Sequence, residues 1–186
     1  MEYGKILGSI VDELAANAGR ISVGEMEALA DVILTGRRVF IAGAGRSGFV
    51  ARAFSNRLMH LGLAVSFVGE PTTPALTAAD VLVIGSGSGE TGSLVTMAQK
   101  AKKIGAKLAT LTIHPEATIG SLADVIVTIP GATPKSSLAD TVRSIQPMGN
   151  TFEQLCWLVY DAVIMILMDK LHRSEEEMFA LHANLE

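Results

Sequence analysis

Three hydroxyl residues interleaved with glycines follow one of the apolar runs in the sequence. Ser86, Ser88 and Thr91 come directly after a stretch that ends in Gly85. A strand that leads through such a segment into a helix presents hydroxyls and unpaired backbone N–H groups to an anion, and Gly87 lets the backbone approach it closely. One hydroxyl is enough to cap a helix, so the presence of three hydroxyls favours a phosphate site. No Gly-Lys-Ser/Thr motif follows, which argues against nucleotide hydrolysis.

A second glycine-rich segment, residues 43–48, also lies between an apolar run and a stretch with helical spacing. It matches the G-x-G-x-x-G pattern of dinucleotide-binding proteins, and Glu70 lies near the end of the next apolar run. A tight turn that needs small residues is an equally simple explanation. Arg46 and Ser47 add polar side chains beside Gly45, which suits a single phosphate or a sugar. We expect these three residues to bind the ligand, although Arg46 can alternatively form a surface ion pair.

Continuous apolar runs alternate with stretches of helical spacing, which predicts a parallel sheet covered on both faces. We expect strands at residues 38–42, 64–68, 81–84, 107–112 and 125–129, and helices at about 6–14, 26–34, 48–61, 91–104 and 151–171. Ser22 and Glu25 fit a capping box for the second helix, which Gly36 would end. The prediction is one three-layer, doubly wound α/β domain over residues 1–186, with about five strands in the order 2-1-3-4-5. Both glycine-rich segments then fall at carboxyl ends of strands, where such sheets bind ligands.

Glu153 is a candidate general base near the start of the last long helix. It follows a loop-like segment that runs from about Pro130 to Pro147. Two capping boxes compete with this interpretation, one formed by Asn150 with Glu153 and the other by Thr151 with Gln154. The residues alone leave both interpretations open.

The four histidines give weaker indications. His182 lies in the C-terminal tail, where an isolated histidine usually has no chemical role. His60 falls at a helix end, where a cation suits the helix dipole, and His172 is expected to be a solvated helix-end residue. His114 follows the fourth apolar run and is a possible lining residue of the site. No two histidines have a zinc-binding spacing, so we expect no metal.

The two glycine-rich segments together resemble those of the sugar isomerase (SIS) domain family. The matching segments are Ala42-Gly-Ala-Gly-Arg-Ser-Gly48, Arg57-Leu-Met-His60, Ile84-Gly-Ser-Gly-Ser-Gly-Glu-Thr91, Ile145-Gln-Pro-Met-Gly149, Phe152-Glu-Gln154 and His182-Ala-Asn-Leu-Glu186. They span most of the chain in the same order. The resemblance implies an enzyme without metal or organic cofactor, with Glu153 as base and His182 as a second acid/base. It also implies that the segment from Ser86 to Thr91 binds the substrate's phosphate.

Two of these segments, Gln146-Pro-Met-Gly149 and His182-Ala-Asn-Leu-Glu186, resemble most closely those of the family members that act on hexulose phosphates. That resemblance implies interconversion of D-arabino-3-hexulose 6-phosphate and D-fructose 6-phosphate through a cis-enediol(ate). This reaction is a step of the ribulose monophosphate pathway, which fixes formaldehyde or supplies ribulose 5-phosphate. The resemblance therefore also implies a functional link to 3-hexulose-6-phosphate synthase. The resemblance further implies a homotetramer, and we expect its active sites to be shared between subunits. The short tail that carries His182 allows this residue to act in its own subunit or in a neighbouring one, and the sequence leaves both options open. A different SIS-family isomerase, a non-catalytic phosphosugar sensor and a small NAD(P)-binding oxidoreductase are the alternatives.

Composition narrows the remaining possibilities. A net charge of -4 with scattered Lys and Arg argues against nucleic-acid binding. An apolar content of 49% suggests that surface is buried between copies of the chain. Cys156 is the single cysteine, so an intrachain disulfide and a cysteine-based zinc site are excluded. The N-terminus lacks a signal-peptide pattern, and the apolar stretch 155–168 contains Asp161 and is short for a bilayer, so we expect a cytoplasmic protein without membrane contact.

Overall fold

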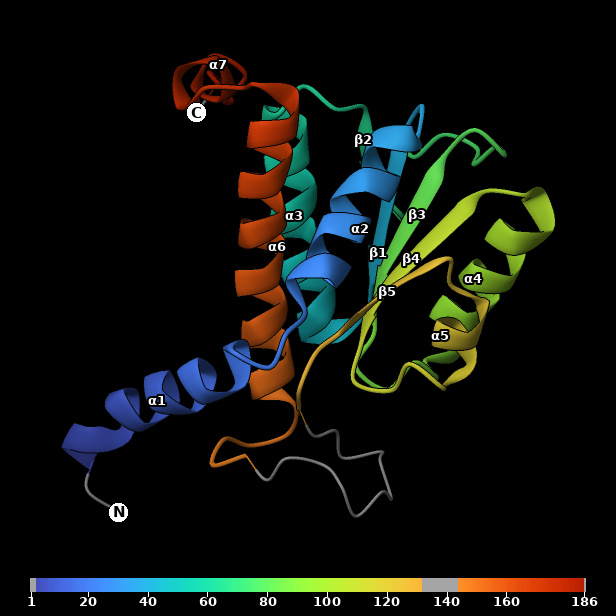
Figure 1. Ribbon diagram of the computed structural model, residues 1–186. Coiled ribbons are helices and arrows are strands. Elements are labelled where there is room, and N and C mark those ends of the chain that lie inside the picture. The colour runs from blue at the N-terminus through green and yellow to red at the C-terminus, as the bar shows by residue number, and fades with distance from the viewer. Residues whose placement is uncertain (1–2, 132–143, 186) are drawn as a thin grey trace.

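A five-stranded parallel sheet forms the centre of the protein, with strand order β2-β1-β3-β4-β5. The computed structural model describes residues 3–131 and 144–185. Helices cover both faces of the sheet (Figure 1). The predicted doubly wound α/β fold and its 2-1-3-4-5 order are therefore confirmed.

The strands lie within a residue or two of their predicted positions. They are β1 (Val39–Gly43), β2 (Val65–Phe67), β3 (Val81–Gly85), β4 (Lys107–Thr112) and β5 (Val125–Thr128). The helices are α1 (Ile6–Ala18), α2 (Val23–Thr35), α3 (Gly45–His60), α4 (Gly92–Ile104), α5 (Thr118–Leu122), α6 (Asn150–Leu171) and α7 (Glu175–Phe179), and a short 3-10 helix, η1, spans Tyr3–Lys5. The short helices α5 and α7 were not predicted, because segments of five residues carry too little periodicity to be recognised.

Two apolar clusters fill the space on either side of the sheet. The larger one joins α2, α3 and α6 to the inward face of β1, β3, β4 and β5, and includes Ile41, Val83 and Leu155. The smaller one lies under α4 and α5, around Ile84 and Leu108. Alternate residues of each strand therefore enter opposite clusters, as expected for strands buried on both faces.

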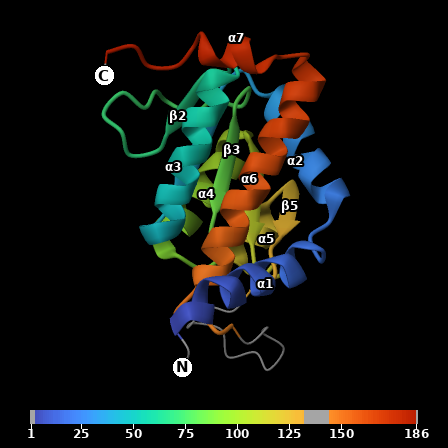
Figure 2. The same cartoon turned by 90° about the vertical axis from the view of Figure 1, so that its left-hand side faces the viewer.

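The helix α6 packs against α1, α2 and α3. Seen from the side, α3 and α6 run next to each other over the sheet, and α7 lies across their far ends (Figure 2). With 22 residues, α6 is long and apolar enough to cross a membrane by length and composition, so the expectation that its apolar stretch is too short is corrected. About half of that stretch is buried against the rest of the fold, as in the core helix of a globular domain.

The predicted capping box of α2 forms only in part. The Ser22 side chain accepts a hydrogen bond from the Glu25 backbone N–H, and Gly36 is the C-cap as expected. The Glu25 carboxylate does not return to Ser22. It accepts hydrogen bonds from the backbone N–H and the hydroxyl of Thr128, at 2.7 and 3.5 Å. A long-range contact to β5 thus replaces the local one.

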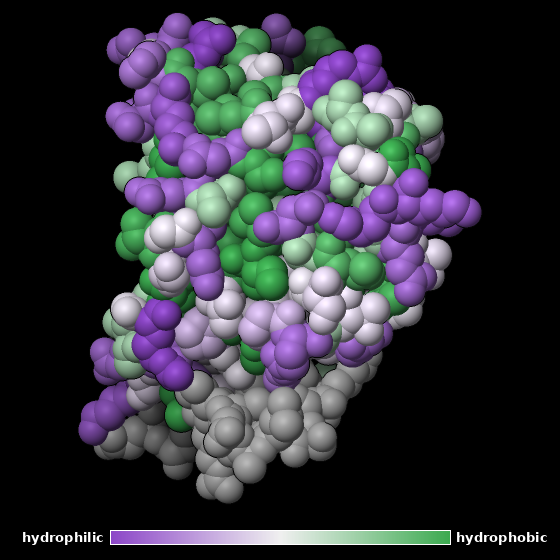
Figure 3. Space-filling view, turned by 45° about the vertical axis from the view of Figure 1, so that its right-hand side comes forward, coloured by the Kyte–Doolittle hydropathy of each residue, from purple (hydrophilic) through white to green (hydrophobic). Residues whose placement is uncertain are grey.

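Apolar side chains reach the surface in several places. Figure 3 shows them as green areas between polar side chains on one face of the molecule. Among the described residues, α1, α3 and α6 also expose large apolar groups, including Leu7, Phe49, Trp157 and Met165. Large exposed apolar areas are typical of interaction surfaces.

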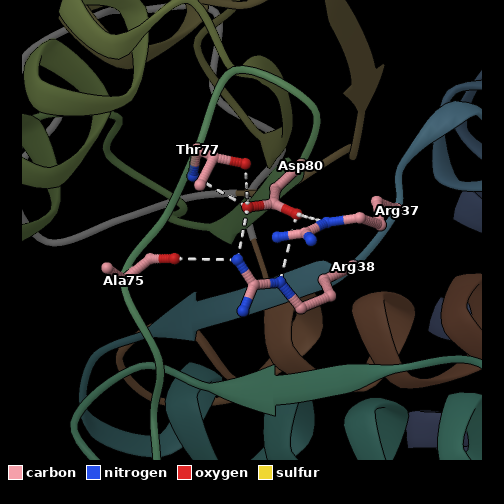
Figure 4. Close-up of polar contacts among 5 residues, drawn as sticks. All are labelled: Arg37, Arg38, Ala75, Thr77 and Asp80. Carbon is pink, nitrogen blue, oxygen red and sulfur yellow. Dashed lines mark hydrogen bonds and ion pairs between the residues drawn. The ribbon is translucent and has the colours of Figure 1, made fainter.

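A buried carboxylate fixes the connection between β2 and β3. Asp80 is 1% exposed and accepts hydrogen bonds from two nitrogens of Arg38, at 3.2 and 3.0 Å, and from the backbone and side chain of Thr77, both at 2.7 Å. Arg37 lies 3.7 Å away, and Arg38 also donates to the carbonyl of Ala75 (Figure 4). The connection is thereby held to the amino ends of β1 and β3. The contacts of Asp80 therefore leave the carboxyl ends of β1 and β3 unobstructed.

Asp80→Asn should lower the free energy of unfolding by about 2 to 4 kcal/mol at neutral pH, because it leaves Arg38 without its buried charged partner. Burial favours the neutral acid, but the bonds from Arg38 and Thr77 dominate and lower the pKa of Asp80 from 3.8 to about 2. Urea unfolding of both proteins measures the difference. Asp31→Asn is the matched control, since its ion pair with Lys170 is exposed and should contribute less than about 1 kcal/mol.

The free energies of unfolding of wild type and Asp80→Asn should depend differently on pH in the acid range. A depressed pKa stabilises the fold at pH values above the unfolded pKa of 3.8, and this stabilisation is lost as the pH falls through about 2. The shift corresponds to about 2 kcal/mol, so the stability curves of wild type and Asp80→Asn should converge between these pH values. Curves that stay parallel would contradict the role given to the Asp80 charge.

Candidate functional site

The candidate site lies where β1 and β3 end next to each other. These strands pair in parallel with Gly43 opposite Gly85. The chain leaves β1 for α3 on one face of the sheet and β3 for α4 on the other. This is the point at which the strand order reverses, and it is where doubly wound sheets bind ligands.

The first glycine-rich segment is a tight strand-to-helix turn. A Cβ atom on Gly43 would lie 2.9 Å from the Cα atom of Gly48, so neither residue can carry a side chain without moving α3 away from β1. Gly45 has a φ of +58°, which favours glycine. Arg46 and Ser47 then lie in the first turn of α3, as predicted. Close packing accounts for the glycine pattern, and a dinucleotide is not needed to explain it.

The hydroxyl-rich segment connects β3 to α4. The Ser86 hydroxyl is buried and has no hydrogen-bond partner in the described chain. Ser88 accepts a hydrogen bond from the Glu90 backbone N–H at 3.3 Å. Thr91 is the N-cap residue of α4, yet its side chain makes no capping bond. Capping therefore does not account for the Thr91 hydroxyl, and an anion at the α4 N-terminus remains available to it.

Glu90 has a separate task in holding this segment. Its carboxylate accepts hydrogen bonds from the backbone N–H and the hydroxyl of Thr118, at 2.6 and 2.9 Å, at the start of α5. These bonds lower the pKa of Glu90. Gly89, with a φ of +64°, lies against α5 as well, since a Cβ atom there would be 2.6 Å from that of Ala117. The segment is thus anchored to α5 on the side away from Arg46.

Glu153 lies in the first turn of α6 and forms an ion pair with Arg46 of α3. Its side chain is 15% exposed, whereas that of Arg46 is 67% exposed. The N-cap of α6 is Gly149, and no side chain caps this helix, so neither capping box formed by Asn150 or Thr151 exists. The local explanation for Glu153 is therefore wrong, and its carboxylate faces a residue of the first glycine-rich segment instead.

A pocket of about 440 Å³ adjoins this ion pair. Apolar side chains of α1, α3 and α6 form its walls, among them Phe49 and Trp157, and Arg46, Glu153 and Gln154 supply the polar groups. Ser86, Ser88 and Thr91 do not line this pocket. The structure thus brings Arg46 and Glu153 together at the pocket, and connects the hydroxyl-rich segment to them through the pairing of β1 with β3.

Sequence analysis did not predict the contacts that hold the start of α6. Gln146 donates hydrogen bonds to Gln154 at 2.8 Å and to Glu13 of α1 at 3.3 Å. Thr151 donates to the same Glu13 at 3.1 Å, and its hydroxyl lies 2.7 Å from that of Ser144. Glu13 thereby fixes the helix turn that carries Glu153. A carboxylate on an amphipathic helix gives no local sign of such a distant partner. The middle of the loop predicted over residues 130–147 lies outside the described residues.

The structure does not bring His182 to Glu153 within one chain. The tail that carries His182 follows α7, at the end of α6 opposite to Glu153 (Figures 1 and 2). The imidazole of His182 stacks on the imidazole of His60, with ring centroids 5.1 Å apart, and on the ring of Phe179, with ring centroids 5.9 Å apart. Burial, followed by the charges of Arg57 and His182, lowers the pKa of His60. A role for His182 in catalysis therefore requires another subunit, and it stays a prediction.

His114 lies at the carboxyl end of β4, on the site side of the sheet. Its Nδ1 atom is 3.3 Å from the Glu116 carboxylate, and its Nε2 atom is buried without a partner. Cys156 is buried on α6, and burial, with the nearby charge of Glu153, raises the pKa of its thiol. Within residues 3–131 and 144–185, no group of three or more His, Cys, Asp or Glu side chains is arranged to hold a metal ion.

The chain thus combines a doubly wound sheet, glycine-rich turns at the switch point of that sheet, and a carboxylate from a later helix beside one of these turns. Residues 33–156 match the model of the SIS domain. The chain belongs to the SIS domain family.

Comparison with individual relatives indicates a narrower group within this family. It is 48% identical over 186 residues to 3-hexulose-6-phosphate isomerase of Bacillus subtilis, covering 100% of both chains. It is 42% identical to 3-hexulose-6-phosphate isomerase of Mycobacterium gastri, covering 97% of this chain and 89% of that protein. A structure from Methanococcus jannaschii, whose inferred molecular function is 3-hexulose-6-phosphate isomerase, superposes with a TM-score of 0.78 at 35% identity, covering 88% of this chain and 86% of that one.

Thr91→Val should weaken binding of a ketohexose 6-phosphate about 5- to 20-fold, because the phosphate site predicted from the sequence would lose one of its hydroxyl donors. Stability should stay nearly unchanged, since the Thr91 side chain caps nothing. Calorimetric titration and thermal melts measure the two effects. Thr96→Val, in the same helix, removes a hydroxyl that bonds only the Gly92 carbonyl and should leave affinity unchanged. Equal affinities for wild type and Thr91→Val would remove Thr91 from the phosphate site.

Proposed function

We propose that the chain is an isomerase that interconverts D-arabino-3-hexulose 6-phosphate and D-fructose 6-phosphate. Identity of 48% over the whole length of a curated 3-hexulose-6-phosphate isomerase supports this substrate pair. The structural observation that carries the proposal is the position of Glu153, which pairs with Arg46 beside the pocket and takes no part in helix capping.

Glu153 is the base of the proposed reaction. Its carboxylate removes the proton from C2 of the 3-hexulose, and the electron pair of that bond forms the C2–C3 double bond while O3 takes up the negative charge. The O2 proton is transferred to O3, the carbonyl reforms at C2, and C3 receives a proton from Glu153. The product is fructose 6-phosphate, with every proton and electron pair accounted for. Such a step needs a base within reach and donors for the developing oxyanion.

The other residues of the site bind and orient the substrate. The phosphate lies at the N-terminus of α4, where Ser88, Thr91 and the backbone N–H groups of the first turn, together with Gly87, surround it. Arg46 exchanges its partner on substrate binding, from the Glu153 carboxylate to a substrate oxygen. Ser47 and the α3 N-terminus at Gly45 add further donors. This exchange frees the carboxylate for the C2 proton.

Two of the three alternatives, the oxidoreductase and the phosphosugar sensor, have less structural support. A dinucleotide site would use Glu70 for a ribose, but this carboxylate pairs with Arg52 at 2.6 Å on the outer side of α3. The alternative of a phosphosugar sensor requires no base, whereas Glu153 lies beside a pocket, on a helix turn that hydrogen bonds to α1 and to the preceding segment hold in place. Full-length identity to isomerases favours the enzyme.

Assembly and cellular role are further parts of the proposal. The chain forms a homotetramer in the cytoplasm, in which the exposed apolar groups of α1, α3 and α6 are covered by other subunits. His182 of one subunit completes the site of another and transfers the proton between O2 and O3. The reaction serves the ribulose monophosphate pathway and uses the product of 3-hexulose-6-phosphate synthase.

Glu153→Gln should lower kcat at least about 1000-fold, because the amide cannot accept the C2 proton. The protein is supplied with ribulose 5-phosphate, formaldehyde and 3-hexulose-6-phosphate synthase, and fructose 6-phosphate is measured through coupled enzymes. Glu70→Gln is the matched control, since it removes a carboxylate paired with an arginine of the same helix α3 but away from the pocket. It should keep full activity.

The outcomes separate the parts of this proposal. Absence of product with well-folded wild-type protein would refute the substrate assignment. Full activity of Glu153→Gln would refute the role of this carboxylate. Loss of activity in Glu70→Gln together with nicotinamide cofactor binding would favour the dinucleotide alternative.

Shared sites predict that two inactive variants restore each other. Mixed oligomers of Glu153→Gln and His182→Asn should regain activity in about a quarter of their sites, because some sites receive both wild-type residues from different subunits. Subunits are exchanged by mild denaturation and refolding, and the unmixed variants treated alike are the control. Mixtures that remain as inactive as their parents would contradict a site built from two subunits.

A further inference from the structure

Buried polar atoms without a partner gather at one end of this fold. In the described part of the chain these atoms are the Ser86 hydroxyl, Nε2 of His114 and the Tyr160 hydroxyl. Ser86 follows β3, His114 follows β4, and Tyr160 reaches the last residue of β3. Most buried polar groups in proteins are hydrogen-bonded, and leaving one unpaired costs stability. Their concentration at the ligand-binding edge indicates partners that a ligand supplies.

Tyr160 is the member of this set that comes from a helix and places its hydroxyl against the end of a strand. Its hydroxyl lies 3.0 Å from where a Cβ atom of Gly85 would be. Apart from the glycine's own neighbours in the chain, no other atom of the described residues lies within 4 Å of that point. The hydroxyl therefore packs closely against the backbone of Gly85, directly before Ser86 and the hydroxyl-rich segment, in a position that a side chain on residue 85 would obstruct.

The ring of Tyr160 cannot turn its hydroxyl elsewhere. It stacks on Phe54 of α3, with ring centroids 4.2 Å apart and planes inclined by 15°. The residue is 2% exposed. Burial, with Cys156 nearby, raises the pKa of the Tyr160 hydroxyl well above its usual value, so the group remains a protonated donor at neutral pH. A fixed donor of this kind is suited to position an oxygen atom.

Tyr160 also has a defined relation to the proposed base. Glu153 and Tyr160 are seven residues apart on α6, so they lie on the same side of the helix, about 10 Å apart along its axis. Side chains of a helix slant toward its N-terminus, which brings the hydroxyl of the long Tyr160 side chain back toward the turn of Glu153. The hydroxyl and the carboxylate thus approach the end of β3 from one helix.

We propose that Tyr160 is a substrate-binding residue whose unpaired hydroxyl, beside Gly85, donates a hydrogen bond to an oxygen of the sugar chain bound at the end of β3. The inference rests on the proposed function for the nature of the ligand, a phosphorylated ketohexose. The hydrogen bond orients the carbon chain between Glu153 and the phosphate at α4. It also selects a ligand with a polar chain over inorganic phosphate, which would occupy the hydroxyl-rich segment alone.

Tyr160→Phe tests this role because it removes one oxygen atom and retains the ring. Affinity for fructose 6-phosphate, measured by calorimetry, should fall about 5- to 20-fold, whereas affinity for inorganic phosphate should not change. The thermal midpoint should stay equal or rise, since an unpaired buried hydroxyl is lost. Val163→Ala, a buried position one turn further along α6, is the control and should lower the thermal midpoint while leaving both affinities unchanged.

Isomerase assays of the same proteins separate this inference from the proposed function. A drop in kcat/KM that parallels the loss of fructose 6-phosphate affinity supports both. Wild-type protein that binds the sugar phosphate more tightly than Tyr160→Phe but does not isomerise it would refute the function and support the Tyr160 contact. Unchanged affinity in Tyr160→Phe, or a lower thermal midpoint with equal loss of phosphate affinity, would overturn the inference and leave Tyr160 a packing residue.

Discussion

The parallel pairing of β1 with β3 is the constraint on which the site depends. It sets Gly43 beside Gly85 and sends the following helices to opposite faces of the sheet. Two helix N-termini are thereby placed next to each other, and each offers backbone N–H groups to an anion. The absence of a side chain on Gly43 lets α3 pack directly on the strand end, and the same absence on Gly85 leaves room for the Tyr160 hydroxyl beside the end of β3.

The helix α6 connects stability with chemistry. Its buried side chains, such as Leu155 and Leu167, belong to the larger apolar cluster, so the helix is fixed over most of its length. Its first turn is in addition held by Glu13 of α1 through Thr151. A carboxylate placed on such a rigid turn keeps its position relative to Arg46 without using its own oxygens for capping. Rigid elements that carry the reacting groups are what catalysis by positioning requires.

The two ends of the molecule have different chemical character. At one end, hydroxyls, Arg46 and Glu153 surround the strand ends. At the other, the imidazoles of His60 and His182 stack near α7, and Asp80 ties the strand connection to the sheet. A monomer therefore separates the residues that the family resemblance combines. In the proposed oligomer, an acid/base from one end of a subunit would serve the site at the other end of its neighbour.

The sequence by itself determined the sheet order, the strand positions and both glycine-rich turns, because apolar periodicity and glycine spacing are local properties of the chain. It also singled out Arg46 and the hydroxyls. Only the tertiary structure decided that Glu153 pairs with Arg46 and caps nothing, since 107 residues separate the two. Sequence analysis did not single out Tyr160, because the contact that distinguishes it is also with a residue far away in the chain. An aromatic residue within an apolar helix has the sequence pattern of a core residue. Only the folded structure shows that its hydroxyl is unpaired and lies next to Gly85.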